Sequence, residues 1–235
     1  MAGDRYIRHQ DFLGYDTWRR LKETPVLVAG VGGLGSHVLQ SIARLAPLTL
    51  EIWDPGTLNE PDLNRQILYR EEDLHRKKVE AASDRLREIN SELNLATIAE
   101  PLSYERFLEK SSLRGSGFLL FDCLDTFTAR GELDRIRELE GCAIFHGGVE
   151  GWFGQASTLR GTGEGYARLF GPEYTSIPPA AKPILPQTVS AVASFQVADY
   201  LHWCETPEES PLSDVMLLYD GRSMRVDRVA LARRG

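Results

Sequence analysis

A glycine-rich turn and one carboxylate downstream of it are the features of this sequence best suited to binding a nucleotide. The turn, Gly30-x-Gly32-Gly33-x-Gly35, directly follows the apolar run 26–29. Glycine lets the backbone adopt positive φ and lets a phosphate approach closely, and the helix expected after the turn would point its free N–H groups at that anion. Asp54 follows about 20 residues later, where a carboxylate can accept hydrogen bonds from both ribose hydroxyls. A dinucleotide site, or a tight turn without a ligand, would fit the same two features.

Three charged residues further along indicate that the nucleotide is cleaved and not only bound. Arg65 lies in the polar run 62–66, and its planar guanidinium can hold a triphosphate through two hydrogen bonds. Lys78 can add a point charge, and the basic run 76–78 begins a predicted helix, where positive charge opposes the helix dipole. One of the two carboxylates in the turn 122–125, that of Asp122 or that of Asp125, could hold the Mg²⁺ that accompanies a reacting triphosphate. Alternatively, the two cations are solvated surface charges and Asp125 caps the helix that follows it.

The predicted elements alternate between strand and helix and place these residues near strand ends. An N-terminal helical arm is expected over 1–22. The predicted strands are 26–29, 48–53, 96–99, 118–121 and 143–145, with helices through about residue 45 and over 76–90, 104–110 and 126–139. Such alternation predicts an α/β fold with a Rossmann-like doubly wound, mostly parallel sheet, whose chemistry lies at the carboxyl ends of its strands.

The second half of the chain departs from this alternation. A strand over 152–159 leads into the stretch 161–186, rich in glycine and proline, which is expected to be a functional or mobile crossover-type loop. A buried helix over 186–203 and a hairpin formed by 215–219 and 224–231 follow it. These strands predict an antiparallel C-terminal extension, and 1–235 is expected to form a single domain.

The composition argues against several classes of protein. The net charge of −7 disfavours non-specific binding to nucleic acid or anionic membranes. No apolar run is long enough for a membrane span, and no N-terminal apolar segment resembles a signal peptide. Three irregularly spaced cysteines exclude a disulfide framework. We therefore expect a cytoplasmic protein that binds phosphate through a local cluster of donors.

The order of the motifs resembles the ThiF/HesA/MoeB family, relatives of the ubiquitin-activating enzymes. The resemblance runs from Arg5-Tyr-x-Arg8 through the glycine turn and Leu63-Asn64-Arg65-Gln66 to Leu217-Leu218-Tyr219-Asp220, which is nearly the whole chain. It implies that the protein uses Mg-ATP to adenylate the C-terminal Gly-Gly carboxylate of a small ubiquitin-fold sulfur carrier protein, with release of pyrophosphate. It also implies a homodimer in which Arg8 reaches the ATP of the neighbouring subunit.

The resemblance implies a role for each matching residue. Arg65 and Lys78 would hold the phosphates and Asp125 would place Mg²⁺, so that with Arg8 they make the catalytic set. The remaining matches make the nucleotide-binding set: Gly30, Gly32, Gly33, Gly35, Asp54, Asn64, Gln66 and Leu124. These roles suit the reaction, because in-line attack by a carboxylate on the α-phosphorus requires the charge of three phosphates to be screened.

Three departures from the family pattern qualify what carries over. Thr162 and Gly165 stand where the first zinc-binding Cys-x-x-Cys pair would fall, and the sequence ends at 235 without the second, so no zinc site is expected. Asp62 replaces the usual asparagine, and a carboxylate beside ATP phosphates is costly unless it touches Mg²⁺ or turns away. The stretch 161–186 lacks the cysteine nucleophile of some relatives, so we expect no catalytic cysteine and no covalent intermediate.

The cysteines and histidines elsewhere have structural interpretations. Cys123, Cys142 and Cys204 fall on turn, strand and helix positions and show no metal-ligand spacing. His146 lies at a strand end and is expected to be a satisfied structural histidine. No general base is needed, since a carboxylate nucleophile is already ionised at neutral pH.

Other functions stay open on the sequence alone. An NAD-dependent oxidoreductase would use the glycine turn and Asp54, but it leaves Arg65, Lys78 and Asp125 unexplained. A non-catalytic nucleotide-binding relative would account for Asp62 and the missing zinc pairs. Within the adenylating class, the substrate carboxylate could belong to a small molecule or a tRNA nucleoside, an option that the acidic net charge disfavours.

Overall fold

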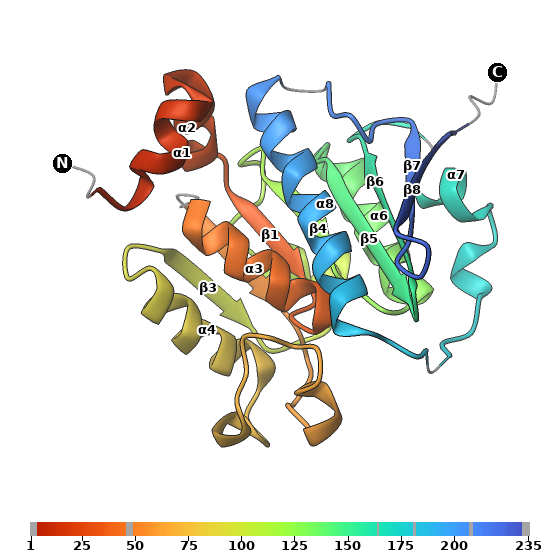
Figure 1. Ribbon diagram of the computed structural model, residues 1–235, viewed down its shortest axis with the longest axis horizontal. Coiled ribbons are helices and arrows are strands. Elements are labelled where there is room, and N and C mark those ends of the chain that lie inside the picture. Colours follow the sequence, from red (N-terminus) through yellow and green to blue (C-terminus); the bar gives the residue numbers. More distant parts are fainter. Residues whose placement is uncertain (1–3, 46–48, 164, 181, 207–208, 232–235) are drawn as a thin grey trace.

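The computed structural model describes residues 4–45, 49–163, 165–180, 182–206 and 209–231, and within these the strands form one sheet in the order β3-β2-β1-β4-β5-β6-β7-β8 (Figure 1). The first five in this order run parallel, whereas β6, β7 and β8 pair antiparallel. The strands span Val26–Ala29 (β1), Thr49–Trp53 (β2), Asn94–Ile98 (β3), Leu119–Asp122 (β4), Ile144–Glu150 (β5), Phe153–Leu159 (β6), Val215–Asp220 (β7) and Arg225–Ala230 (β8). The predicted α/β fold, with its mostly parallel sheet and antiparallel C-terminal extension, is confirmed.

Helices cover both faces of the parallel part of the sheet, as a doubly wound fold requires. α3, α4 and α8 pack on one face, and α5 and α6 pack on the other. The helices span Ile7–Leu13 (α1), Tyr15–Glu23 (α2), Gly33–Leu45 (α3), Lys78–Ile89 (α4), Tyr104–Lys110 (α5), Phe127–Glu140 (α6), Tyr166–Phe170 (α7) and Pro186–Glu205 (α8). Short 3-10 turns occupy Asp4–Tyr6, Glu60–Asp62, Glu71–Asp73 and Tyr174–Ser176.

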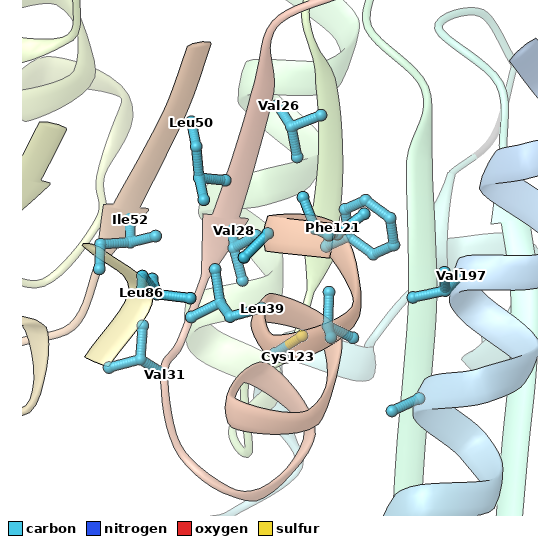
Figure 2. Close-up of a cluster of buried hydrophobic side chains, with 14 of the residues drawn as sticks. Val26, Val28, Val31, Leu39, Leu50, Ile52, Leu86, Phe121, Cys123 and Val197 are labelled. Carbon is cyan, nitrogen blue, oxygen red and sulfur yellow. The ribbon is translucent and has the colours of Figure 1, made fainter. Parts of the chain in front are cut away.

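Each face of the sheet has its own apolar core, because a central parallel strand is covered on both sides. All four residues of β1 are buried, and neighbours along it enter opposite cores, Val28 one and Leu27 the other. Figure 2 shows Val28 and Phe121, from adjacent strands, gathered against Leu39 of α3. The two cores hold the strands in place and therefore fix where their carboxyl ends lie.

The carboxyl ends of β1 and β4 lie side by side at the topological switch point of the sheet. Ala29 pairs with Asp122, so the glycine turn after β1 and the turn 122–125 after β4 begin next to each other. At Gly30 the backbone has a φ of 89°, and a Cβ there would lie 2.6 Å from the Cys123 carbonyl oxygen. Only glycine fits between the two turns. This edge is where open α/β sheets bind their ligands.

The predicted N-terminal arm consists of two helices rather than one. Gly14, with a φ of 78°, separates α1 from α2. Trp18 and Leu21 of α2 are buried in the first core, and Arg20 donates hydrogen bonds to the carbonyls of residues 204 and 205 at the end of α8. The arm is therefore anchored on its own subunit, although no residue of α1 is buried.

Other predicted boundaries shift for identifiable reasons. The helix predicted from residue 76 begins at Lys78, because Lys77 pairs with Thr57 in an isolated β-bridge. Lys77 is thus the N-cap residue and Lys78 the first residue of the helix, whereas Arg76 lies before it. The strand predicted over 143–145 continues to Glu150, because β6 pairs with its whole length. Leu48, predicted to begin the second strand, lies outside the described residues.

The first half of the crossover stretch 161–186, up to the 3-10 turn at 174–176, packs on α6, whereas the described residues from 177 to 183 are exposed. It contains α7 and the 3-10 turn at 174–176. Arg137, buried on α6, donates to the carbonyls of Arg160 and Gly163 at 2.7 and 3.0 Å. Tyr166 and Tyr174 belong to the second apolar core. Buried side chains therefore hold the part of this stretch up to Tyr174 in place.

We predict that Gly35→Ala lowers the free energy of unfolding by about 2 kcal/mol or more, the scale of an overpacked interior. A Cβ at this position would lie 1.9 Å from the Gly30 carbonyl oxygen, so α3 and the turn would have to move apart. Urea unfolding at neutral pH measures the effect. Gly32→Ala is the matched control, because the nearest atom to its added Cβ is 3.7 Å away. Equal stabilities of the two variants would contradict this account of the turn.

Candidate active site

A cavity of about 1250 Å³ opens at the carboxyl edge of the parallel strands, beside the switch point. Both turns, the end of β2, the polar run after the 3-10 turn at 60–62 and the first residue of α4 line it. It brings together these predicted site residues: Gly30, Gly32, Gly33, Asp54, Arg65, Gln66, Lys78, Leu124 and Asp125. Within the described part of the chain, Gly35, Asn64 and Arg8 do not line it. The gathering of residues from 30 to 125 at one cavity is what a nucleotide site requires.

The Asp54 carboxylate is held in place by two backbone N–H groups. Its Oδ2 accepts from Val31 at 2.9 Å, and its Oδ1 accepts from Gly56 at 2.7 Å. Each carboxylate oxygen has a further lone pair available. Asp54 therefore ties the glycine turn to the end of β2 and still offers acceptors to the cavity, which fits the predicted contact with ribose hydroxyls.

The two predicted phosphate-binding cations face one carboxylate, that of Asp62. Lys78 Nζ lies 3.2 Å from its Oδ2, and Arg65 Nη2 lies 3.6 Å from its Oδ1. Asn64 accepts a hydrogen bond from Arg65 Nη1 at 3.0 Å, so it orients the guanidinium from outside the cavity. Asp62 has therefore not turned away from the predicted phosphate site, and it is paired with the cations of that site.

Gln66 presents an unsatisfied polar atom at the wall of the cavity. Its side chain is 2% exposed, and its Nε2 donates to Asp62 Oδ1 at 2.6 Å. Its buried Oε1 has no hydrogen-bond partner among the residues that the structure describes. A buried acceptor without a donor costs free energy. Gln66 therefore combines one unfilled, buried acceptor with a position in the lining of the cavity.

The side chain that caps α6 is Thr126 and not Asp125. Thr126 Oγ1 accepts from the Ala129 N–H at 3.3 Å. Asp125 is exposed on the cavity wall, and no hydrogen bond to its carboxylate is found within the described ranges. Hard oxygen ligands of this kind suit Mg²⁺ that arrives on a triphosphate. The residues present therefore fit the predicted magnesium role, with Asp125 as the protein's oxygen ligand.

Asp122, the other carboxylate that the sequence offers for Mg²⁺, is instead the buried residue that holds this turn. Its Oδ2 accepts hydrogen bonds from Arg130 Nε, His146 Nδ1 and Tyr166 Oη at 2.7 to 2.8 Å. Its Oδ1 accepts from the Leu124 N–H at 3.0 Å, which sets the path of the chain towards Asp125. The available signal was that Asp122 and His146 are polar residues at the ends of two buried strands that a doubly wound sheet places side by side.

The charge states in this cluster follow from burial and pairing. Burial by itself would raise the pKa of Asp122, but the Arg130 guanidinium and the hydrogen bond from His146 lower it below its usual range. Burial lowers the pKa of His146, against the opposing effect of Asp122. Because an ionised carboxylate can only accept, His146 Nδ1 carries the proton, and its Nε2 accepts from Gln155 at 3.2 Å. His146 is therefore a satisfied buried histidine, as the sequence predicts.

The three cysteines are buried, which disfavours their ionisation. Burial raises the pKa of Cys142 and of Cys204 to about 12, and it raises the pKa of Cys123 well above its usual value. A thiol must ionise to act as a nucleophile. Cys123 lines the cavity, yet the same burial keeps it protonated.

Arg8 lies at the opposite end of the sheet from the cavity. α1 and α2 are placed where β1 begins, whereas the glycine turn follows the end of β1 (Figure 1). Arg8 is exposed, and its neighbours Ile7, Phe12 and Tyr15 are 50%, 88% and 75% exposed. Arg8 therefore does not reach the cavity of its own subunit, and the arm offers an uncovered apolar surface.

The described residues offer neither a protein-built metal site nor a membrane-spanning helix. Among them, no group of three or more His, Cys, Asp and Glu side chains is arranged to hold a metal ion. No helix within the described ranges has the length and apolar character that a bilayer crossing needs.

A doubly wound sheet with a glycine turn, a carboxylate and two cations around one cavity is the arrangement of a nucleotide-binding α/β protein. The chain belongs to the ThiF family, whose model matches residues 4–235. Among curated relatives, it is 29% identical to the SAMP-activating enzyme E1 of Haloferax volcanii over an alignment of 237 positions that covers 96% of this chain and 84% of that one. It is 32% identical over 121 residues to the molybdopterin-synthase adenylyltransferase of Haemophilus influenzae, with 52% of this chain and 49% of that one covered.

Solved structures agree on the fold. Selenomethionine PaaA superposes with a TM-score of 0.80 at 18% identity, over 99% of this chain and 84% of that one. E. coli MccB, in its complex with ATP, also superposes with a TM-score of 0.80 at 18% identity, over 99% of this chain and 73% of that one. At this identity the likeness establishes the fold alone.

We predict that Asp122→Asn lowers the free energy of unfolding by about 3–5 kcal/mol at neutral pH, because it leaves Arg130 buried without its counter-charge. The lowered pKa of Asp122 means that the ionised carboxylate stabilises the fold above about pH 4, its unfolded range, and that this contribution is lost as the pH falls further. The variant should therefore lose less stability than the wild type on acidification below about pH 4.

Urea unfolding across this pH range measures both effects. Asp125→Asn is the matched control, since Asp125 is exposed and lies outside the cluster. Its stability should stay within about 0.5 kcal/mol of the wild type. An Asp122→Asn variant as stable as this control would mean that the cluster does not hold the turn.

Proposed function

We propose that this protein is an ATP-dependent adenylyltransferase that activates the C-terminal Gly-Gly carboxylate of a small ubiquitin-fold sulfur carrier protein. The observation that carries the proposal is the placement of Arg65, Lys78 and Asp125 around the same cavity as the glycine turn. Two cations and a free carboxylate serve a magnesium-bound triphosphate, and hydride transfer has no use for them as a group. The names of the relatives, which include adenylyltransferases and E1-like activating enzymes, support the same class.

In the proposed reaction, a carboxylate oxygen of the carrier attacks the α-phosphorus of ATP. The new bond is a mixed anhydride, and the bond from the α-phosphorus to the bridging oxygen breaks, with its electron pair leaving on pyrophosphate. Arg65 and Lys78 offset the negative charge that otherwise repels the nucleophile. Asp125 would hold Mg²⁺, which when bound screens phosphate charge. The backbone N–H groups of the glycine turn and of the N-terminus of α3 would donate hydrogen bonds to the phosphates of the nucleotide.

The outer half of the cavity suits the tail of a protein substrate. One face of β6, β7 and β8 forms this wall, where Phe153 and Leu218 are 60% and 41% exposed. Lys182 and Arg225 also line the cavity, and each is paired with a carboxylate of the lining, Glu150 at 3.5 Å and Asp227 at 2.9 Å. An extended tail that ends in two glycines is narrow enough to pass from this surface to the α-phosphate.

We propose that the reaction ends at the acyl-adenylate, without a catalytic cysteine. The described residues of the stretch 161–186 include Thr162, Thr175 and Ser176 but no thiol, and a hydroxyl is a weak acceptor without an adjacent base. The buried free cysteines also suit the cytoplasm, where thiols stay reduced, and we place the protein there.

We further propose a homodimer in which Arg8 completes the partner's active site. Arg8 lies away from its own cavity, and α1 exposes Ile7 and Phe12 beside it. Exposed apolar side chains on an arm that is anchored by α2 are suited to cover a second copy of the chain.

We predict that Asp125→Ala and Arg65→Ala each lower carrier-dependent ATP–pyrophosphate exchange at least about a hundredfold, the scale for one preorganised electrostatic contact. The assay uses a panel of Gly-Gly-ended sulfur carriers with labelled pyrophosphate. Arg87→Ala is the control, because Arg87 is an exposed α4 residue outside the cavity. Wild-type exchange in either cavity variant would remove that residue from the mechanism. Exchange with a small carboxylate or a tRNA, and with no carrier, would favour the alternative substrates.

We predict that mixing Arg8→Ala and Asp125→Ala subunits restores part of the exchange activity that each variant lacks. A mixed dimer would contain one site with both residues intact, whereas neither homodimer contains any. Exchange measured after subunit mixing, with dimer formation checked by native mass spectrometry, gives the result. No rescue in a mixed dimer that demonstrably forms would contradict the shared site.

A further inference from the structure

The Asp62 carboxylate makes contact with three side chains that the proposed function assigns to ATP. Lys78 Nζ lies 3.2 Å from Oδ2, Arg65 Nη2 lies 3.6 Å from Oδ1, and Gln66 Nε2 donates to Oδ1 at 2.6 Å. All these groups line the cavity together with Asp62 itself. The carboxylate therefore lies between the cations that would otherwise present two positive charges to an anion.

The position of this carboxylate is set by its own turn rather than by the cations. Asp62 ends the 3-10 turn at 60–62, and its Oδ2 accepts from the Asn59 N–H at 3.0 Å in a capping box. Its backbone N–H in turn donates to the Asn59 carbonyl at 2.9 Å. Movement of the Arg65 or Lys78 side chain would leave these bonds in place, so the carboxylate would stay beside the phosphate site when the cations turn to a ligand.

The pairing is shielded enough from water to affect binding. The side chains of Asp62 and Lys78 are each 14% exposed, and that of Arg65 is 22% exposed. Charges in such partly buried positions are screened much less than those on an open surface. Without Asp62, the two cations would also repel each other across the cavity.

We propose that Asp62 is a positioning residue that acts as an internal counter-anion for Arg65 and Lys78. In the protein without nucleotide, its carboxylate takes the place of a phosphate and keeps both cations directed at the cavity. A polyphosphate must draw the cations away from Asp62 while accepting a fixed negative charge nearby. Asp62 therefore weakens the binding of ATP and of the pyrophosphate product, which favours product release. The proposal rests on the proposed use of Arg65 and Lys78 for polyphosphate.

The test compares Asp62→Asn with wild type by calorimetric titration of inorganic tripolyphosphate, a probe that needs no carrier protein. Asparagine keeps the shape and an acceptor for the Asn59 N–H while it removes the charge. We expect at least about tenfold tighter binding, because a like charge beside a bound anion is strongly unfavourable at a shielded site. The affinity should also fall more steeply with salt, since the site gains net positive charge. A variant with a damaged site would bind tripolyphosphate more weakly, so tighter binding by Asp62→Asn cannot result from structural damage.

Glu60→Gln is the matched control. It makes the same change in net charge within the same turn, but Glu60 is exposed and lies outside the cavity, so its affinity should equal that of wild type. Should Asp62→Asn not fold, Asp62→Ser provides a second uncharged side chain with an acceptor oxygen. Loss of the fold in both variants would overturn a role confined to the cavity.

Equal affinity of Asp62→Asn and wild type, or no binding by either, would overturn the proposal. If Asp62→Asn binds tripolyphosphate more tightly but the wild type shows no pyrophosphate exchange, the role of Asp62 stands and the proposed reaction is contradicted. If the wild type shows exchange but Asp62→Asn binds no more tightly, the proposed reaction stands and the role of Asp62 is contradicted.

Discussion

The buried ion pair between Asp122 and Arg130 is the interaction on which the geometry of the cavity depends. Asp122 is fully buried, and its carboxylate also accepts from His146 of β5 and from Tyr166 of the crossover stretch. A carboxylate in this position is stable only when its charge is offset and its lone pairs are filled. The donors to the Asp122 carboxylate come from α6, β5 and the crossover stretch, so its hydrogen bonds connect these elements to β4. A further hydrogen bond, from the Leu124 N–H, sets the turn that presents Asp125.

The anion-binding side of the cavity follows the same physical logic with carboxylates nearer to solvent. Asp54 and Asp62 are both held by backbone N–H groups of adjacent turns, so neither depends on a ligand for its position. Asp54 leaves acceptor capacity for hydroxyl groups. Asp62 instead forms ion pairs with Arg65 and Lys78, so the site attracts anions less strongly than these two cations would without it.

The two segments outside the nucleotide-binding layers are anchored differently. The first half of the crossover stretch is tied to α6 through Arg137 and to the central cluster through Tyr166, so this half is part of the folded core. The arm is tied through α2, while α1 has no buried residue and exposes Phe12 almost entirely. The buried contacts of the crossover stretch indicate a role within its own subunit, whereas the exposed apolar side chains of α1 indicate a contact with another molecule.

The sequence by itself determined the fold class and the glycine turn, and most of the site residues that it predicted do line the cavity. These are local properties, because strand and helix periodicity, the need for glycine at Gly30 and the placement of chemistry at strand ends can each be read from short segments. The neighbours of a polar side chain are not local. Asp122 meets His146 because β4 pairs with β5, and Asp62 meets Lys78 because the loop after β2 folds back onto the start of α4. Only the tertiary structure could decide these pairings, because hydrogen bonds and ion pairs act over a few ångströms between residues that the chain separates widely.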